Sequence, residues 1–185
     1  MKASDYFSQY FETISQGLKS INSAQLENAS AMVLEAHQSG KKIIIVGNGG
    51  SAAMASHVAV DFTKAAGIRA VNFNEADLIT CFANDYGYEY WVEKALEFYA
   101  DQGDLVILIS SSGNSLNMIN GAKKAKAMGL SLITLSGFSE RNPLRGHGDI
   151  NLWTNSTAYN IVEMTHHIWL LAIIDFLIES KKTEG

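Results

Sequence analysis

The sequence predicts an α/β protein with a doubly wound, mainly parallel sheet of five strands. Five short segments are apolar over their whole length, which is typical of strands covered by helices on both faces. Segments with helical periodicity alternate with these strands. Two loops rich in glycine and serine directly follow two of the strands. Such a fold binds its ligands beyond the carboxyl ends of the strands.

Two helices are expected before the sheet. The first has apolar side chains at helical spacing over residues 6–18, with Ser4 or Asp5 as its cap. The second covers residues 24–37 and ends at Ser39-Gly40. The strands are expected at residues 42–46, 69–73, 104–109, 130–135 and 149–153. The remaining helices are expected at residues 52–66, 77–82, 88–99, 116–128 and 159–179, the last of them long and apolar almost all round.

Length and composition limit the class of protein. The chain has 185 residues, so we expect a single domain over residues 1–185. One cysteine, Cys81, fits a reducing compartment and is expected to be buried. The net charge of −5 disfavours a nucleic-acid partner. There is no apolar leader at the N-terminus, and the apolar segment 168–174 is shorter than the ~20 residues that span a bilayer. We therefore expect a cytoplasmic protein with no membrane segment.

The two loops are the strongest functional signal. They read Gly47-Asn48-Gly49-Gly50-Ser51 and Ser110-Ser111-Ser112-Gly113-Asn114-Ser115. Each joins a strand to a helix N-terminus, where backbone N–H groups and the helix dipole favour an anion. Neither loop is a Walker A or Gly-x-Gly-x-x-Gly motif, which disfavours a nucleotide. The loops therefore predict a site for a small phosphorylated ligand, and the alternative interpretation is two tight turns whose serines cap helices.

Together with Ala83-Asn84-Asp85-Tyr86-Gly87, the two loops resemble the sugar isomerase (SIS) fold and, more narrowly, the phosphoheptose isomerase family. The resemblance implies one flavodoxin-like SIS domain and a homotetramer that binds a sugar phosphate at subunit boundaries. It implies isomerisation between sedoheptulose 7-phosphate and a mannoheptose 7-phosphate for bacterial surface polysaccharide, including lipopolysaccharide. The substrate-binding residues that it implies are Asn48, Gly49, Ser51, Asn84, Asp85, Ser110, Ser111, Ser112 and Ser115.

Isomerisation of this kind needs a base, an acid and stabilisation of an enediolate oxygen, which a zinc ion can supply. His57 and Asp61 are four residues apart, and the last helix carries Glu163, His166 and His167. The resemblance matches His57 to a metal-binding histidine and Asp61 to a catalytic glutamate. The expected catalytic residues are Asp61, Glu163, His166 and His167, and the expected zinc ligands are His57, Asp61, Glu163 and His166.

The last helix departs from the family pattern. A distal histidine of the family falls on Leu171 or on Leu170, depending on how the motif is matched. One interpretation is that His166 or His167 replaces it from one turn earlier. The other is a non-catalytic sugar-phosphate-binding SIS protein that acts as a regulator or assembly partner. A third possibility is another phosphosugar reaction of this fold, such as amino-sugar isomerisation.

Overall fold

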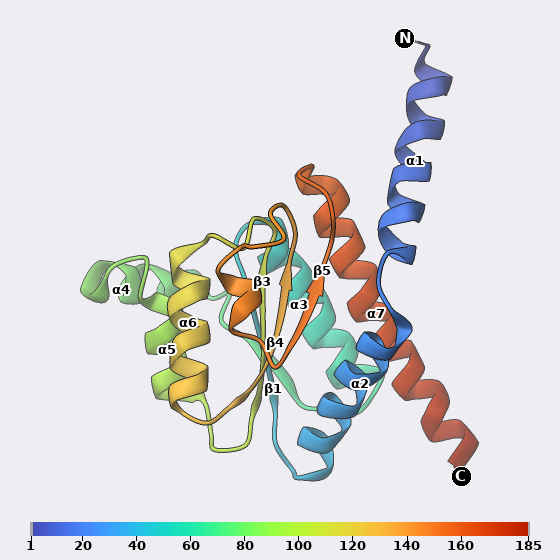
Figure 1. The fold of residues 1–185 in the computed structure, drawn as a ribbon. Coiled ribbons are helices and arrows are strands. Elements are labelled where there is room, and N and C mark those ends of the chain that lie inside the picture. The colour runs from blue at the N-terminus through green and yellow to red at the C-terminus, as the bar shows by residue number, and fades with distance from the viewer. Residues whose placement is uncertain (1, 185) are drawn as a thin grey trace.

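The computed structural model describes residues 2–184, which alternate between strands and helices after two initial helices (Figure 1). The strands are β1 (Ile43–Gly47), β2 (Ala70–Asn72), β3 (Leu105–Ser110), β4 (Ser131–Ser136) and β5 (Ile150–Trp153). The helices are α1 (Ala3–Lys19), α2 (Ser23–Gln38), α3 (Gly50–Lys64), α4 (Ala76–Tyr86), α5 (Trp91–Tyr99), α6 (Leu116–Ala127) and α7 (Tyr159–Glu184), with a short 3₁₀ helix at Leu144–Gly146.

The sheet has the strand order β2-β1-β3-β4-β5, and each neighbouring pair is parallel. This is the flavodoxin-like order, so the predicted fold class is confirmed. The order reverses between β1 and β3, where successive crossovers pass to opposite faces of the sheet. The loops that follow β1 and β3 therefore open on the same crevice. They are the two glycine- and serine-rich loops.

Helices cover both faces of the sheet because alternate strand residues point to opposite sides. In β1, Ile43 and Ile45 pack into a core with α2, α3 and α7, whereas Ile44 and Val46 pack with α5 and α6. All of these side chains are fully buried. Figure 1 shows the resulting layers, with α5 and α6 on one side of the sheet and α2, α3 and α7 on the other. Continuous apolar strands are thus explained by burial on both faces.

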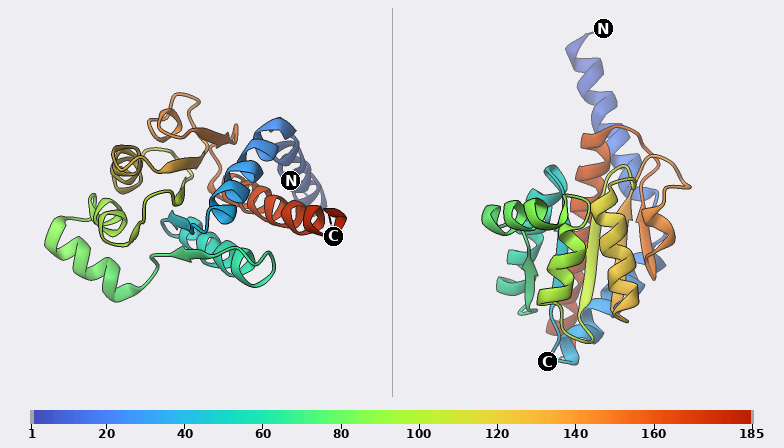
Figure 2. Two further views of the ribbon diagram at one scale, coloured as in Figure 1. Left: turned by 90° about the horizontal axis from the view of Figure 1, so that it is seen from below. Right: turned by 90° about the vertical axis from the view of Figure 1, so that its left-hand side faces the viewer.

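The start of α1 and the environment of Cys81 differ from expectation. The helix begins at Ala3 with Lys2 as its N-cap, so Ser4 and Asp5 lie in the first turn and cap nothing. Cys81 is exposed, because it lies on α4, which buries none of its residues. Figures 1 and 2 show α4 projecting from the body on the side opposite α1. The predicted burial of Cys81 was wrong because α4 does not cover the sheet.

The last helix, α7, extends to Glu184 and is therefore longer than the expected range of residues 159–179. Its length and composition suffice to cross a membrane, contrary to the expectation from residues 168–174. Half of its apolar window is buried inside the domain, against α1, α2 and α3. Trp169 anchors it, since its indole N–H donates to the carbonyl of Leu18 at 3.1 Å. Such burial is typical of the core helix of a soluble domain.

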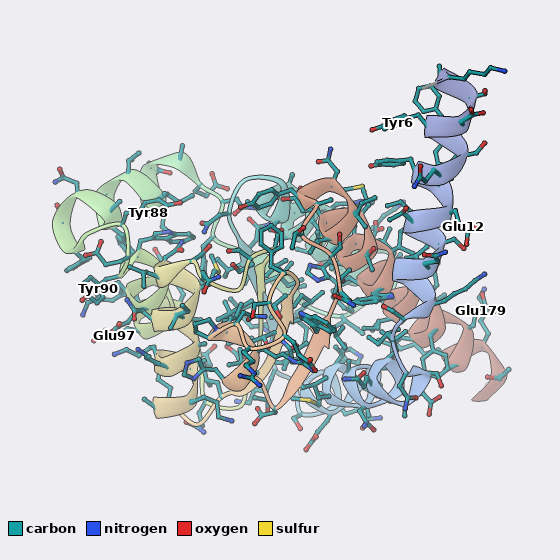
Figure 3. The ribbon with its side chains drawn as sticks, turned by 45° about the horizontal axis from the view of Figure 1, so that its top comes forward. Tyr6, Glu12, Tyr88, Tyr90, Glu97 and Glu179 are labelled. Atoms are coloured by element: carbon teal, nitrogen blue, oxygen red, sulfur yellow. The ribbon has the colours of Figure 1, made fainter. Side chains whose placement is uncertain are left out.

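Helix α1 projects from the body of the domain and buries no residue in its own chain (Figure 1). Its aromatic side chains Tyr6, Phe7 and Phe11 are 48%, 55% and 66% exposed. Figure 3 shows Tyr6 near the free end of the helix, away from the sheet. The C-terminal part of α1 packs on α7 through Leu18, whereas the exposed aromatic rings form an amphipathic surface that contact with another protein would stabilise.

Candidate functional site

A cavity of about 110 Å³ lies at the carboxyl ends of β1 and β3, where the fold places ligands. Its lining consists mostly of hydroxyl and amide side chains. The lining residues are Asn48, Ser51, Ile109, Ser110, Ser111, Ser112, Ser115, Tyr159 and Glu163. We call this cavity and its lining the serine cradle. Six of the nine residues that the resemblance implies for substrate binding line it: Asn48, Ser51, Ser110, Ser111, Ser112 and Ser115.

Two helix N-termini open on the serine cradle without a capping side chain. The N-cap residues are Gly49 for α3 and Ser115 for α6, and neither makes a side-chain cap hydrogen bond. Gly49 has a φ of 53°, a value that glycine adopts without strain. The uncapped N–H groups and the two helix dipoles favour a bound anion, as expected for a phosphate group.

The side chain of Asn48 is held at the wall of the serine cradle by three hydrogen bonds. Its Nδ2 donates to Oδ1 of Asn117 at 3.0 Å, and Nδ2 of Asn117 donates back to Oδ1 of Asn48 at 2.9 Å. The hydroxyl of Tyr88 donates to the same Oδ1 at 3.1 Å. Sequence reasoning missed Asn117 and Tyr88, because their role depends on partners 69 and 40 residues away.

Glu163 brings a carboxylate to the edge of the serine cradle. The hydroxyl of Ser111 donates to its Oε1 at 3.4 Å. The carboxylate lies directly over Gly50, where a Cβ would come within 2.2 Å of Oε2. Glycine at this position therefore makes room for Glu163. Tyr159, one turn earlier on α7, also lines the cradle and was missed by the sequence analysis.

A second cluster lies further along α3 and α7 and contains His57, Asp61 and His167. Nδ1 of His57 is 2.9 Å from Nε2 of His167. The other ring nitrogen of His57, Nε2, is 3.2 Å from Oδ2 of Asp61. The two imidazole rings meet edge to face. Burial lowers the pKa of His167, and the neighbouring His57 lowers it further, whereas Asp61 acts in the opposite direction. The cluster is a chain of groups that can hold and pass a proton.

His166 does not join this cluster. Its side chain is fully buried, and its Nε2 lies 3.0 Å from the carbonyl oxygen of Ser136. Burial lowers its pKa from 6.5 to about 4, despite the bond to that carbonyl. Adjacent residues on a helix point about 100° apart, so His166 faces the core while His167 faces α3. The expected role of His166 as acid, base or metal ligand does not fit this buried position.

The buried imidazole of His166 makes a testable contribution to stability. The pKa of His166 is about 4 in the folded chain and 6.5 in the unfolded chain, where the imidazole is in water. The unfolded chain therefore binds the proton more readily. Its stabilising effect is therefore complete above pH 6.5 and is lost as the pH falls towards 4. We expect a loss of about 3 kcal/mol from this residue.

Urea unfolding at pH 7.5 and pH 4.5 measures this contribution. We expect the free energy of unfolding to fall between the two pH values by about 2–3 kcal/mol more in the wild type than in His166→Gln, because most but not all of the loss is reached at pH 4.5. His147→Gln serves as the control, because His147 lies in a loop and is only partly buried. Equal pH dependence in the wild type and in His166→Gln would contradict the assignment.

The four expected zinc ligands do not fit a metal site within one chain. Asp61 and His167 lie at opposite nitrogens of His57, so they cannot share one ion with it. Glu163 points into the serine cradle, and His166 is in the core. Among residues 2–184, no three histidine, cysteine, aspartate or glutamate side chains are placed to hold a metal together.

Asn84 and Asp85 lie outside the serine cradle of their own chain. Both are exposed near the end of α4, where Nδ2 of Asn84 donates to Oδ1 of Asp85 at 2.9 Å. Because α4 projects from the domain, its end is free to meet another surface (Figure 2). The structure thus divides the expected site residues among the serine cradle, the His57–Asp61–His167 cluster and the end of α4, and it places His166 in the core.

Comparison with known proteins places this arrangement in a family. A family model described as the SIS domain matches residues 5–137. The phosphoheptose isomerase of Fusobacterium nucleatum is 38% identical over 141 residues, which are 74% of this chain and 72% of that protein. That of Campylobacter concisus is 35% identical over 163 residues, 84% of this chain and 85% of that protein.

The fold agrees with this relationship. The structure of a phosphoheptose isomerase from Neisseria gonorrhoeae superposes with a TM-score of 0.86 at 26% identity, covering 94% of this chain and 97% of that one. Sequence similarity and overall fold therefore agree. The chain belongs to the SIS domain family and, within it, to the phosphoheptose isomerases.

Proposed function

We propose that this chain is an aldose–ketose isomerase that interconverts sedoheptulose 7-phosphate and a mannoheptose 7-phosphate for bacterial surface polysaccharide, including lipopolysaccharide. The observation that carries the proposal is the serine cradle, whose hydroxyls and two uncapped helix N-termini suit a phosphate group. The His57–Asp61–His167 cluster supplies a carboxylate and two imidazoles for proton transfer. Family membership agrees with both parts.

The two parts of the site have separate tasks. The hydroxyls of Ser51, Ser110, Ser112 and Ser115 hold the phosphate and fix the sugar. The carboxylate of Asp61 removes the proton from the carbon next to the carbonyl, and the electron pair passes to the carbonyl oxygen to give an enediolate. Asp61 then returns the proton to the neighbouring carbon, the former carbonyl carbon, while the hydroxyl proton of the first carbon moves to the former carbonyl oxygen, so that the carbonyl group changes place. His57, whose Nε2 lies 3.2 Å from Asp61, orients the carboxylate, and His167 holds the His57 ring.

The distance between the two parts favours a site shared between subunits. Asp61 is ten residues after Ser51 on α3, a separation of ~15 Å at 1.5 Å per residue. That separation is longer than the carbon skeleton of a seven-carbon sugar. One substrate can therefore reach the serine cradle of one subunit and the His57–Asp61–His167 cluster of another more easily than both parts of the same subunit. Exposed apolar side chains on α1 and α7, among them Phe11, Ile168 and Phe176, offer contact surfaces. We therefore propose a cytoplasmic homotetramer, and a monomer by sedimentation would contradict it.

Turnover is tested directly. Purified protein is incubated with sedoheptulose 7-phosphate, and the aldose product is followed by NMR. Parallel samples contain added zinc or a chelator, because within residues 2–184 of one chain no three metal-ligating side chains lie together. An amino-sugar phosphate in a further sample tests the related reaction. Absence of turnover under all metal conditions would contradict the proposed reaction for the heptose substrate.

A non-catalytic sugar-phosphate-binding protein, acting as a regulator or assembly partner, is the second candidate. The observation that favours it is Leu171 or Leu170 at the place of the distal family histidine. Both candidates bind a sugar phosphate, but only the isomerase turns it over. Turnover that depends on Asp61 would exclude this candidate, whereas ligand binding without turnover would support it.

Binding itself is tested at the serine cradle. The double variant Ser110→Ala/Ser112→Ala removes two hydroxyls from its lining. We expect sedoheptulose 7-phosphate to raise the thermal midpoint of the wild type and to leave that of the variant unchanged, because each lost bond to a charged group weakens binding by about 1.5–3 kcal/mol. Ser180→Ala, on the exposed end of α7, is the control. An undiminished shift in the double variant would place the phosphate elsewhere.

A further inference from the structure

The amide of Asn48, which lines the serine cradle, is oriented by hydrogen bonds to two side chains that lie outside the cradle. Asn48 follows β1 directly, and its amide forms a reciprocal pair with Asn117, the second residue of α6. Asn117 is only 2% exposed and is not among the lining residues. Tyr88, which lies just beyond α4 (Figure 3), donates a further hydrogen bond to Asn48.

The hydrogen-bond capacity of Asn48 shows what remains for a ligand. An amide oxygen accepts two hydrogen bonds, and an amide nitrogen donates two. Oδ1 of Asn48 already accepts from Nδ2 of Asn117 at 2.9 Å and from the hydroxyl of Tyr88 at 3.1 Å. Nδ2 of Asn48 donates one of its two N–H groups to Oδ1 of Asn117 at 3.0 Å. The second N–H of Nδ2 is the only unused part of the side chain.

We propose that Asn117 is a positioning residue that makes Asn48 a hydrogen-bond donor to an oxygen of the bound sugar phosphate. Without Asn117, the amide of Asn48 could turn and present its oxygen, which would face the oxygens of the ligand and repel them. The reciprocal pair prevents that rotation. The hydroxyl of Tyr88 supports the same orientation by donating to the second lone pair of Oδ1 of Asn48. Because Tyr88 makes one hydrogen bond to Asn48 and Asn117 makes two, loss of the Tyr88 hydroxyl has a smaller effect than loss of Asn117.

This inference rests on the binding part of the proposed function and not on turnover. It therefore holds for the isomerase and for the non-catalytic protein alike. It predicts that Asn117 influences the ligand only through Asn48. A residue that merely stabilised α6 would instead lower the thermal midpoint without a specific dependence on Asn48.

A double-mutant cycle on affinity for sedoheptulose 7-phosphate tests the inference. Titration calorimetry is applied to the wild type, Asn48→Ala, Asn117→Ala and the double variant. We expect each single variant to weaken binding about tenfold, and the double variant to bind no more weakly than Asn48→Ala. Tyr88→Phe is expected to weaken binding less than Asn117→Ala. If the isomerase activity is present, KM rises more than kcat falls.

Asn120→Ala is the matched control. Asn120 lies one turn further along α6, and its Nδ2 donates to the carbonyl of Glu89 at 2.9 Å, outside the serine cradle. We expect it to change the thermal midpoint as Asn117→Ala does, with unchanged affinity. Additive losses in the double variant, or equal losses in Asn120→Ala, would overturn the inference. A wild type that does not bind the sugar phosphate would overturn the proposed function and the inference together.

Discussion

Asp61→Asn is expected to lower kcat for the isomerisation of sedoheptulose 7-phosphate by about a hundredfold to ten-thousandfold. The amide keeps the size of the side chain but cannot accept the proton that isomerisation must move. Asp61 lies outside the serine cradle, so the affinity for the sugar phosphate should be nearly unchanged. Calorimetry for binding and NMR for turnover separate these two effects.

Two further variants sharpen the result for Asp61. Asp61→Glu keeps the carboxylate and provides the residue that resembles the family pattern, so it should retain most of the activity that Asp61→Asn loses. Asp175→Asn, at an exposed position of α7, is the control for loss of a negative charge and should have wild-type activity. If Asp61→Asn has normal kcat, the base lies elsewhere and the role of the His57–Asp61–His167 cluster is disproved.

Gly113→Ala is expected to destabilise the domain by about 3 kcal/mol and to abolish binding of the sugar phosphate. Gly113 has a φ of 67°, a backbone conformation that residues with a side chain rarely adopt. A Cβ at this position would lie 1.9 Å from Oδ1 of Asn142. Asn142 cannot move aside easily. Its Nδ2 donates to Ser136 and Ser139, and its Oδ1 accepts from the backbone N–H of Arg145 at 3.0 Å.

The change at Gly113 displaces the loop that lines the serine cradle, so stability and binding should fall together. Urea unfolding measures the first and thermal shift with sedoheptulose 7-phosphate the second. Gly146→Ala is the matched control, because a Cβ at Gly146 meets nothing within 4 Å. A Gly113→Ala protein with normal stability and normal binding would show that the close approach to Asn142 is relieved without consequence.

The fold was predictable from local patterns, because a strand buried on both faces has no polar positions. Residues 43–47 and 105–110 show this in the sequence, and they form the two strands on either side of the crevice. The glycine- and serine-rich loops after them were also visible in the sequence, but serine is a common helix cap, so only the structure shows that these two helix N-termini have no side-chain cap. Helix ends differ from the expected ones by up to five residues, as at the end of α7, because tertiary contacts decide the boundary.

The site was predictable only in part, because rotation about a helix axis depends on the neighbouring elements. His166 and His167 are adjacent in sequence, yet one is in the core and the other faces His57. On a helix that is apolar almost all round, no periodicity indicates which face meets α3. Asn117 was hidden for a related reason, since its partner Asn48 is 69 residues away.

In the proposed homotetramer, helix α1 would link the stability of the chain to its concentration. No residue of this 17-residue helix is fully buried in its own chain, and only its C-terminal part packs on α7, so its N-terminal part is at most marginally stable in water. If a second chain covers its aromatic face, association contributes free energy that the monomer lacks, and mass action then governs unfolding. On dilution, α1 would unfold before the sheet does. Such a protein has no single melting temperature, only one for each concentration at which it is measured.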